Sequence, residues 1–137
     1  KEEGLEEKCV YLMKKYRITN FFFLDQSFPM LIKTALGGNI KTAVRFSSYE
    51  SIDTVLKFKD IVEWVWIDYY EMYPLNNQII EILKINNFKI CLVSPELQGR
   101  STETILRAQS SISSFKKNIN AVCTKNISLW ESFYKAN

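Results

Sequence analysis

The stretch "FKICLVSPELQGR", residues 88–100, joins an apolar run to a polar turn. Its first part, "KICLV" (89–93), has no polar alternation, which is typical of a strand buried on both faces of a parallel sheet. Pro95 ends such a strand, and Gly99 allows a turn that leads into Arg100. The stretch therefore predicts a buried strand with a polar loop at its carboxyl end.

Similar short runs, rich in aromatic and β-branched residues, recur along the chain at "FFFLD" (21–25), "TAVRF" (42–46), "WVWID" (64–68) and "NAVCT" (120–124). Segments with helical spacing lie before and between them, at "KCVYLMKKY" (8–16), "YESIDTVLKFK" (49–59), "NNQIIEILKIN" (76–86) and "STETILRAQSSISSFKK" (101–117). This alternation predicts an α/β fold with five parallel strands in β/α repeats. It fits a partial TIM-type barrel or a five-stranded doubly wound sheet, and periodicity alone does not separate the two.

Local signals mark the ends of these helices. Ser47 with Glu50 and Ser128 with Glu131 fit the capping-box pattern, and "GGN" (37–39) indicates a turn from helix back to strand. There is no linker, repeat array or low-complexity segment. We therefore predict that residues 1–137 form a single domain.

Composition excludes several classes of function. The chain has no histidine, which removes the commonest general base and transition-metal ligand. Its net charge is +3, and no run of basic residues stands out in the sequence. We therefore expect no nucleic-acid partner. The three cysteines, Cys9, Cys91 and Cys123, match no zinc spacing, and we interpret them as reduced, buried thiols.

No stretch reaches the roughly 18 to 20 apolar residues that a membrane span requires. We therefore expect a cytoplasmic protein with no membrane span. The sequence begins at Lys1 without an initiator methionine, which suggests a fragment of a longer protein.

Ionisable residues follow or end every strand run. They are Asp25, Arg45, Asp68, Glu96 and Lys125. Because the carboxyl ends of parallel strands share one edge of the sheet, we expect these groups to meet at one mouth. Arg45 lies inside a strand run and requires an anionic partner, so an ion pair with Asp68 is a structural interpretation of both residues.

Four of these segments, "NFFFLDQSFP", "AVRFSSYES", "WVWIDYYE" and "ICLVSPELQGR", resemble in order the later strands of the glycerophosphodiester phosphodiesterase and phosphatidylinositol-specific phospholipase C-like superfamily. The resemblance implies a (β/α) barrel that hydrolyses phosphoric diesters at its carboxyl-end mouth. It covers nearly the whole chain but only the second half of the family domain. The chain would then be the C-terminal part of a longer barrel, and its partner would be the missing N-terminal half.

The resemblance also implies roles for individual residues. Lys1, Arg45, Glu96 and Arg100 would bind substrate or phosphate, while Asp25 and Asp68 would be mouth carboxylates that meet a phosphodiester or polyol. A divalent cation, Mg²⁺ or Ca²⁺, is implied for the full-length protein. The family's His-Arg-Gly strand, Glu-x-Asp strand and His-Asp turn are absent, so catalytic residues are unknown and we predict that the isolated chain is inactive. Lys125 and Asn126 replace part of the family's Thr-Asp-x-Pro pattern, which leaves Lys125 without an implied ligand role.

Two alternatives remain open. A response-regulator receiver domain would use Asp25, Asp68, Ser94 and Lys125 in that order, although it leaves Arg45 unexplained. A non-catalytic binding or scaffold module would be a barrel that has lost its histidines.

Overall fold

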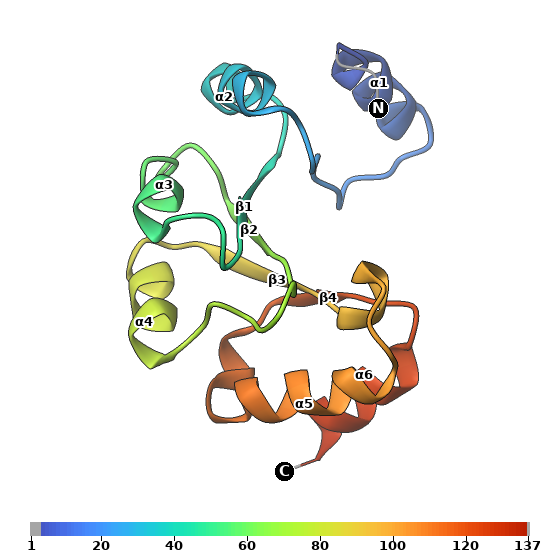
Figure 1. The fold of residues 1–137 in the computed structure, drawn as a ribbon. Coiled ribbons are helices and arrows are strands. Elements are labelled where there is room, and N and C mark those ends of the chain that lie inside the picture. Colours follow the sequence, from blue (N-terminus) through green and yellow to red (C-terminus); the bar gives the residue numbers. More distant parts are fainter. Residues whose placement is uncertain (1–3, 137) are drawn as a thin grey trace.

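A computed structural model describes residues 4–136 of the chain. The described elements are α1 (Glu6–Lys15), α2 (Phe28–Gly37), β1 (Ala43–Phe46), α3 (Ile52–Leu56), β2 (Trp64–Ile67), α4 (Asn77–Ile85), β3 (Lys89–Val93), the 3-10 helix η1 (Pro95–Gln98), α5 (Glu103–Ile112), the 3-10 helix η2 (Ser113–Asn118), β4 (Ala121–Cys123) and α6 (Ile127–Lys135). Figure 1 shows their arrangement. The predicted α/β class is confirmed.

The sheet has four parallel strands in the order β1-β2-β3-β4. Each strand therefore pairs with the next strand along the chain. A doubly wound sheet requires a point where the strand order reverses, and the described sheet has no such point. Its sequential order also differs from that of a receiver domain.

The prediction of five strands is wrong for the described residues, because the run at 21–25 forms only one bridge, between Phe23 and Thr42. Asp25 adopts a left-handed backbone conformation with φ of 56°, which turns the chain out of the extended conformation after Leu24. Phe22 stacks on Trp64 with ring centroids 5.0 Å apart. The aromatic residues that made this run look like a strand therefore anchor a short extended segment instead.

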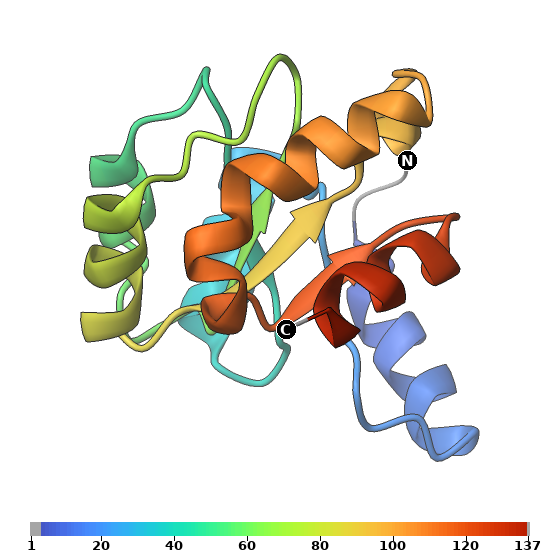
Figure 2. The same cartoon turned by 90° about the horizontal axis from the view of Figure 1, so that it is seen from below.

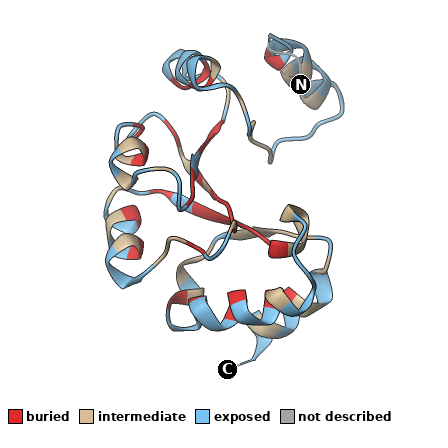
Figure 3. Ribbon diagram, viewed as in Figure 1, coloured by how far each residue is buried: buried red, intermediate tan, exposed pale blue. Residues whose placement is uncertain are grey.

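One side of the sheet carries the hydrophobic core. Val44, Val65, Ile90 and their alternate neighbours along the strands pack with apolar residues from α2, α3, α4 and α5. These helices follow one another around one side of the sheet in Figure 1, and α6 joins the same core through Trp130. Figure 3 shows that the buried residues gather on the strands and on the helix faces turned toward them.

The other side of the sheet is more open. Arg45 and Lys89 are exposed there, and Trp64 and Trp66 are half-buried. Because side chains alternate along a strand, these residues lie opposite the helix-covered face. Figure 2 shows α5 and α6 on the helical side, with α6 beside β4.

Helix ends differ partly from the sequence signals. Gly38 has φ of 67° and ends α2, as "GGN" predicts. The capping box predicted at Ser47 is wrong, because α3 begins after Ser51, whose hydroxyl accepts a hydrogen bond from Asp53 N at 3.1 Å. The one predicted at Ser128 is wrong too, because Asn126 is the N-cap residue of α6.

The three cysteines are free thiols, as predicted, but only Cys91 is buried. Cys9 and Cys123 are half-exposed. No helix in residues 4–136 is long and apolar enough to cross a membrane.

Candidate functional site

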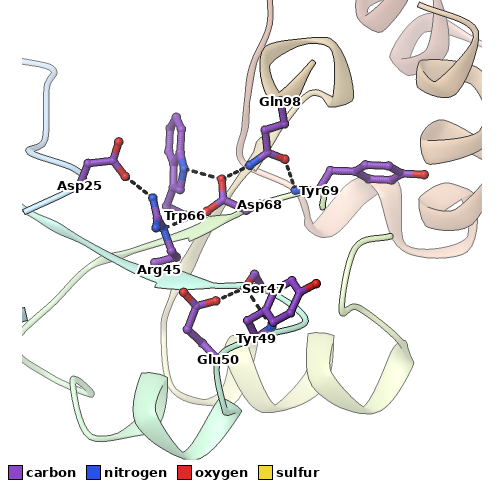
Figure 4. A network of polar contacts seen from close by, with 9 residues as sticks. All are labelled: Asp25, Arg45, Ser47, Tyr49, Glu50, Trp66, Asp68, Tyr69 and Gln98. Atoms are coloured by element: carbon purple, nitrogen blue, oxygen red, sulfur yellow. Dashed lines mark hydrogen bonds and ion pairs between the residues drawn. The ribbon is translucent and has the colours of Figure 1, made fainter. Parts of the chain in front are cut away.

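Three charged residues from three neighbouring segments form a contact network at the carboxyl ends of the strands. Arg45, on β1, lies between Asp25, at the end of the extended segment, and Asp68, directly after β2 (Figure 4). Its Nε lies 2.9 Å from Asp68 Oδ2, and its Nη2 donates a hydrogen bond to Asp25 Oδ1. We call these three residues the Arg45 cluster. The predicted ion pair between Arg45 and Asp68 is therefore present, with Asp25 as an additional partner.

Asp68 is the buried member of this cluster, with only 3% of the residue exposed. Its Oδ1 accepts hydrogen bonds from Trp66 Nε1 at 3.2 Å and from Gln98 Nε2 at 2.7 Å. Its Oδ2 is buried and lies in the ion pair with Arg45, without a hydrogen bond from any described residue. Burial raises the pKa of Asp68, and the positive charge of Arg45 opposes this rise.

Arg45 keeps 42% of its side chain exposed, so the cluster is accessible from solvent. Burial lowers the pKa of Arg45, but the charges of Asp68 and Asp25 outweigh burial and raise it. A cavity of about 340 Å³ opens beside the guanidinium and is lined by Asp25, Gln26, Phe28, Leu31, Ala43, Arg45, Glu50 and Thr54. The site therefore combines one cation, two lining carboxylates and apolar walls.

The polar turn after β3 supports the cluster through Gln98. While its amide nitrogen binds Asp68, its Oε1 accepts a hydrogen bond from Tyr69 N at 2.7 Å. Gly99 has φ of 76°, and Arg100 then donates a hydrogen bond from Nη2 to the carbonyl of Tyr70. Arg100 thus fastens the turn to the loop after β2, whereas the sequence assigned it a phosphate-binding role.

Gln98 is the functional neighbour that sequence reasoning missed. A glutamine in a polar turn has no distinctive pattern, and only the fold shows that it lies against Asp68 across 30 residues of sequence. Its position within "SPELQGR" was the only available signal.

Glu96 holds the ends of β3 and β4 together. Its Oε1 accepts hydrogen bonds from Thr124 Oγ1 at 2.5 Å and from Lys125 N at 3.0 Å, while Oε2 accepts one from Ser94 Oγ. Burial raises the pKa of Glu96, but these hydrogen bonds outweigh burial and lower it to about 2. No contact described for Glu96 joins it to the Arg45 cluster, so its predicted substrate-binding role is left without support from the geometry.

Two further positions bear on the receiver alternative. Ser94 is fully buried, and its hydroxyl accepts a hydrogen bond from Trp130 Nε1 at 2.7 Å. Lys125 contacts Glu96 through its backbone, and the residue is exposed. The hydroxyl that a receiver would present to a phosphoryl group is therefore used inside the core.

The loop after β1 brings another carboxylate to the site. Ser47 Oγ donates a hydrogen bond to Glu50 and accepts one from Tyr49 N at 3.1 Å (Figure 4). Glu50 also lines the cavity beside Arg45. The sequence pattern predicts a helix cap at Ser47 and Glu50, whereas the buried Ser47 holds Glu50, which lines the cavity.

The described residues do not fit the divalent cation that the resemblance implies. Among residues 4–136 there is no group of three or more histidine, cysteine, aspartate or glutamate residues that could hold a metal ion. The guanidinium of Arg45 occupies the space between Asp25 and Asp68. Lys1 lies outside the described residues, so its predicted role stays a prediction.

Comparison with known proteins adds no relative. No protein-family model matches this chain, and no curated protein matches its sequence. Any function must therefore be argued from the fold and the Arg45 cluster.

Proposed function

We propose that this chain is the C-terminal part of a glycerophosphodiester phosphodiesterase-like phosphoric diester hydrolase. In this proposal it supplies part of the substrate mouth, and the missing N-terminal half of the barrel supplies the proton-transfer groups and any divalent cation. The longer protein would be cytoplasmic. The sequential order of the parallel strands supports half of a (β/α) barrel, in which each strand pairs with its neighbour in sequence.

The observation that carries the proposal is the placement of Arg45. An arginine whose side chain is 42% exposed, and whose guanidinium is held by two carboxylates, lines a cavity at the carboxyl ends of parallel strands. Arginine presents a planar set of donors that matches two oxygens of a phosphate. Held in place by Asp25 and Asp68, it would lose little side-chain entropy when a ligand binds.

The carboxylates in the cavity lining also favour one kind of ligand over another. Asp25 and Glu50 line the cavity with Arg45, and their oxygens can accept hydrogen bonds from hydroxyl groups. These negative charges would repel a free phosphate dianion more strongly than a singly charged diester, whose glycerol hydroxyl groups would also donate hydrogen bonds to the carboxylates. The proposed ligand is therefore a polyol phosphodiester.

Binding can be tested by titrating the chain with glycerophosphocholine while recording amide chemical shifts. We expect shifts at Arg45, at Glu50 and in the loop after β2. Arg45→Lys keeps the charge but loses the planar donors, so we expect at least tenfold weaker binding. Arg107→Lys, on the exposed face of α5, is the matched control and should bind like the wild type. Unchanged binding by Arg45→Lys would contradict the proposal.

A non-catalytic binding module is the second candidate. It is favoured by one observation, that Asp25 and Asp68 already balance the charge of Arg45, as in a structural ion-pair network. A hydrolysis assay on the longer protein separates the two candidates. Release of glycerol 3-phosphate supports the hydrolase, and binding without release supports the module.

A further inference from the structure

Within residues 4–136, no strand pairs with the outer edge of β4. β4 pairs with β3 on one side, where Cys123 O accepts a hydrogen bond from Ser94 N at 2.9 Å. In a parallel ladder, successive residues direct their backbone groups to opposite sides, so the N–H and C=O of Val122 face away from β3. A groove of about 730 Å³ runs along this edge and is lined by Ile119, Asn120, Ala121, Val122, Cys123, Thr124, Ile127, Trp130, Glu131, Tyr134 and Lys135. We call it the β4 groove.

The opposite end of the same sheet carries a matching edge. In the extended segment 21–24, Phe23 N donates a hydrogen bond to Lys41 O at 2.8 Å, and Phe23 O accepts one from Ala43 N at 2.9 Å. The backbone groups of Phe22 and Leu24 therefore face away from β1. This segment is rich in aromatic residues, and among the described residues its outer side forms no backbone hydrogen bond, so it can pair with the edge of β4.

Charges at the ends of these two edges are complementary. Asp25 follows the extended segment, and the exposed Lys125 follows β4. If the two edges pair in parallel, as all strands of this sheet do, their carboxyl ends lie together and Lys125 meets Asp25. The Asp25 side chain is 27% exposed beside Arg45.

We propose that the β4 groove binds the segment 21–24 of a second copy of this chain. A two-fold dimer of this kind forms the contact twice and closes both open edges of each sheet. It also places Lys125 of the second copy beside the Arg45 cluster. This dimer concerns the 137-residue chain by itself, because in the proposed longer protein the N-terminal half would pair with these edges instead.

Analytical ultracentrifugation of the 137-residue chain over a range of concentrations tests the proposal. We expect a monomer–dimer equilibrium that weakens as salt is added. Lys125→Glu should raise the dissociation constant at least tenfold, whereas Lys59→Glu, a matched change in the exposed turn after α3, should leave it unchanged.

A backbone change provides an independent check. Val122→Pro removes an outward N–H without removing a hydrogen bond to β3, so the variant should keep the wild-type circular dichroism spectrum and lose the dimer. A chain that stays monomeric at all concentrations would overturn the proposal and leave the edge to the missing barrel half. Open-ended oligomers would overturn the two-fold closure. Ligand titrations at dilute, monomeric concentrations test the proposed function separately.

Discussion

Asp68 and Arg45 depend on each other more than a surface ion pair does. Only 4% of the Asp68 side chain is exposed, while the guanidinium of Arg45 is its one cationic partner among the described residues. A buried carboxylate that loses its partner remains desolvated and uncompensated. The contribution of this pair to stability should therefore appear mainly when one member is removed alone.

Arg45→Met should destabilise the chain by about 2 kcal/mol, less than a fully buried pair because Arg45 is partly exposed. Adding Asp68→Asn should recover part of this loss, since the amide carries no charge. Urea unfolding of both variants and of the wild type measures the difference. If the double variant is no more stable than Arg45→Met, Asp68 is not the origin of the cost.

Because of Glu96, the free energy of unfolding should depend on pH in the acidic range. The pKa of Glu96 is lowered from the ordinary value of 4.5 to about 2 in the folded chain, so its ionised form stabilises the fold above pH 4.5. This contribution is lost as the pH falls from about 4.5 toward 2. The stability of Glu96→Gln should therefore decrease less than that of the wild type over this range, as measured by urea unfolding. Parallel curves for the two proteins would contradict this assignment.

At the residue scale, the sequence indicated an anionic partner for Arg45, since an arginine inside a strand run is unfavourable without one. Asp68 was expected as that partner, and the ion pair confirms it. The role of Glu96 could not be predicted, because its hydrogen bonds from Thr124 and Lys125 depend on how β3 and β4 align. Contacts that cross strands require the register, which local patterns do not contain.

Among the elements, η1 is the one that connects the sheet to the site. This single short turn contains Glu96, which clamps β4, and Gln98, which binds Asp68. Its residues therefore connect the carboxyl end of β3 to the end of β4 and to the loop after β2.

Gln98→Ala should destabilise the chain by about 1 to 3 kcal/mol, because the buried Asp68 loses a donor and Tyr69 N loses an acceptor. Gln78→Ala, on an exposed position of α4, is the matched control and should change stability by less than about 0.5 kcal/mol. Thermal and urea unfolding measure both. Equal small effects would show that η1 does not support Asp68.

Helical periodicity predicted the positions of α1, α3, α4 and α5, but it named no segment for α2 or α6 and did not fix where each helix begins. Both Ser47 and Ser51 have residues that suit a cap, and the chain uses Ser51, four residues later. The difference follows from the loop geometry, because Ser47 binds Glu50 and Tyr49 N directly after β1. Several serines in one stretch offer alternative caps, and tertiary contacts select among them.

For the whole molecule, the sheet is central, and the part of the chain that the structure describes places no further strand beyond β4 or beyond the segment at 21–24. β2 and β3 each pair with two strands, while β4 pairs with one. The run at 21–25 looks like a strand in sequence, yet within the described part of the chain it forms only the bridge between Phe23 and Thr42. Composition predicts that a segment can form a strand, but not whether a neighbour is present to pair with it.

Amide hydrogen exchange should follow this pattern of pairing. At concentrations low enough to keep the chain monomeric, we expect slow exchange at Val65 and Ile90, in the fully buried strands β2 and β3. Val122, whose N–H faces away from β3 on the edge strand β4, should exchange much faster. Equal protection across the sheet at these concentrations would contradict an open β4 edge.

The sequential strand order also has a consequence for synthesis on the ribosome. Every strand pairs with the strand before it in the chain, so no strand must wait for a distant segment that has not yet been made. Low sequence separation between contacting segments favours rapid folding. Each newly made strand–helix module can therefore dock on the previous one as it emerges, and the chain can fold progressively from its amino end.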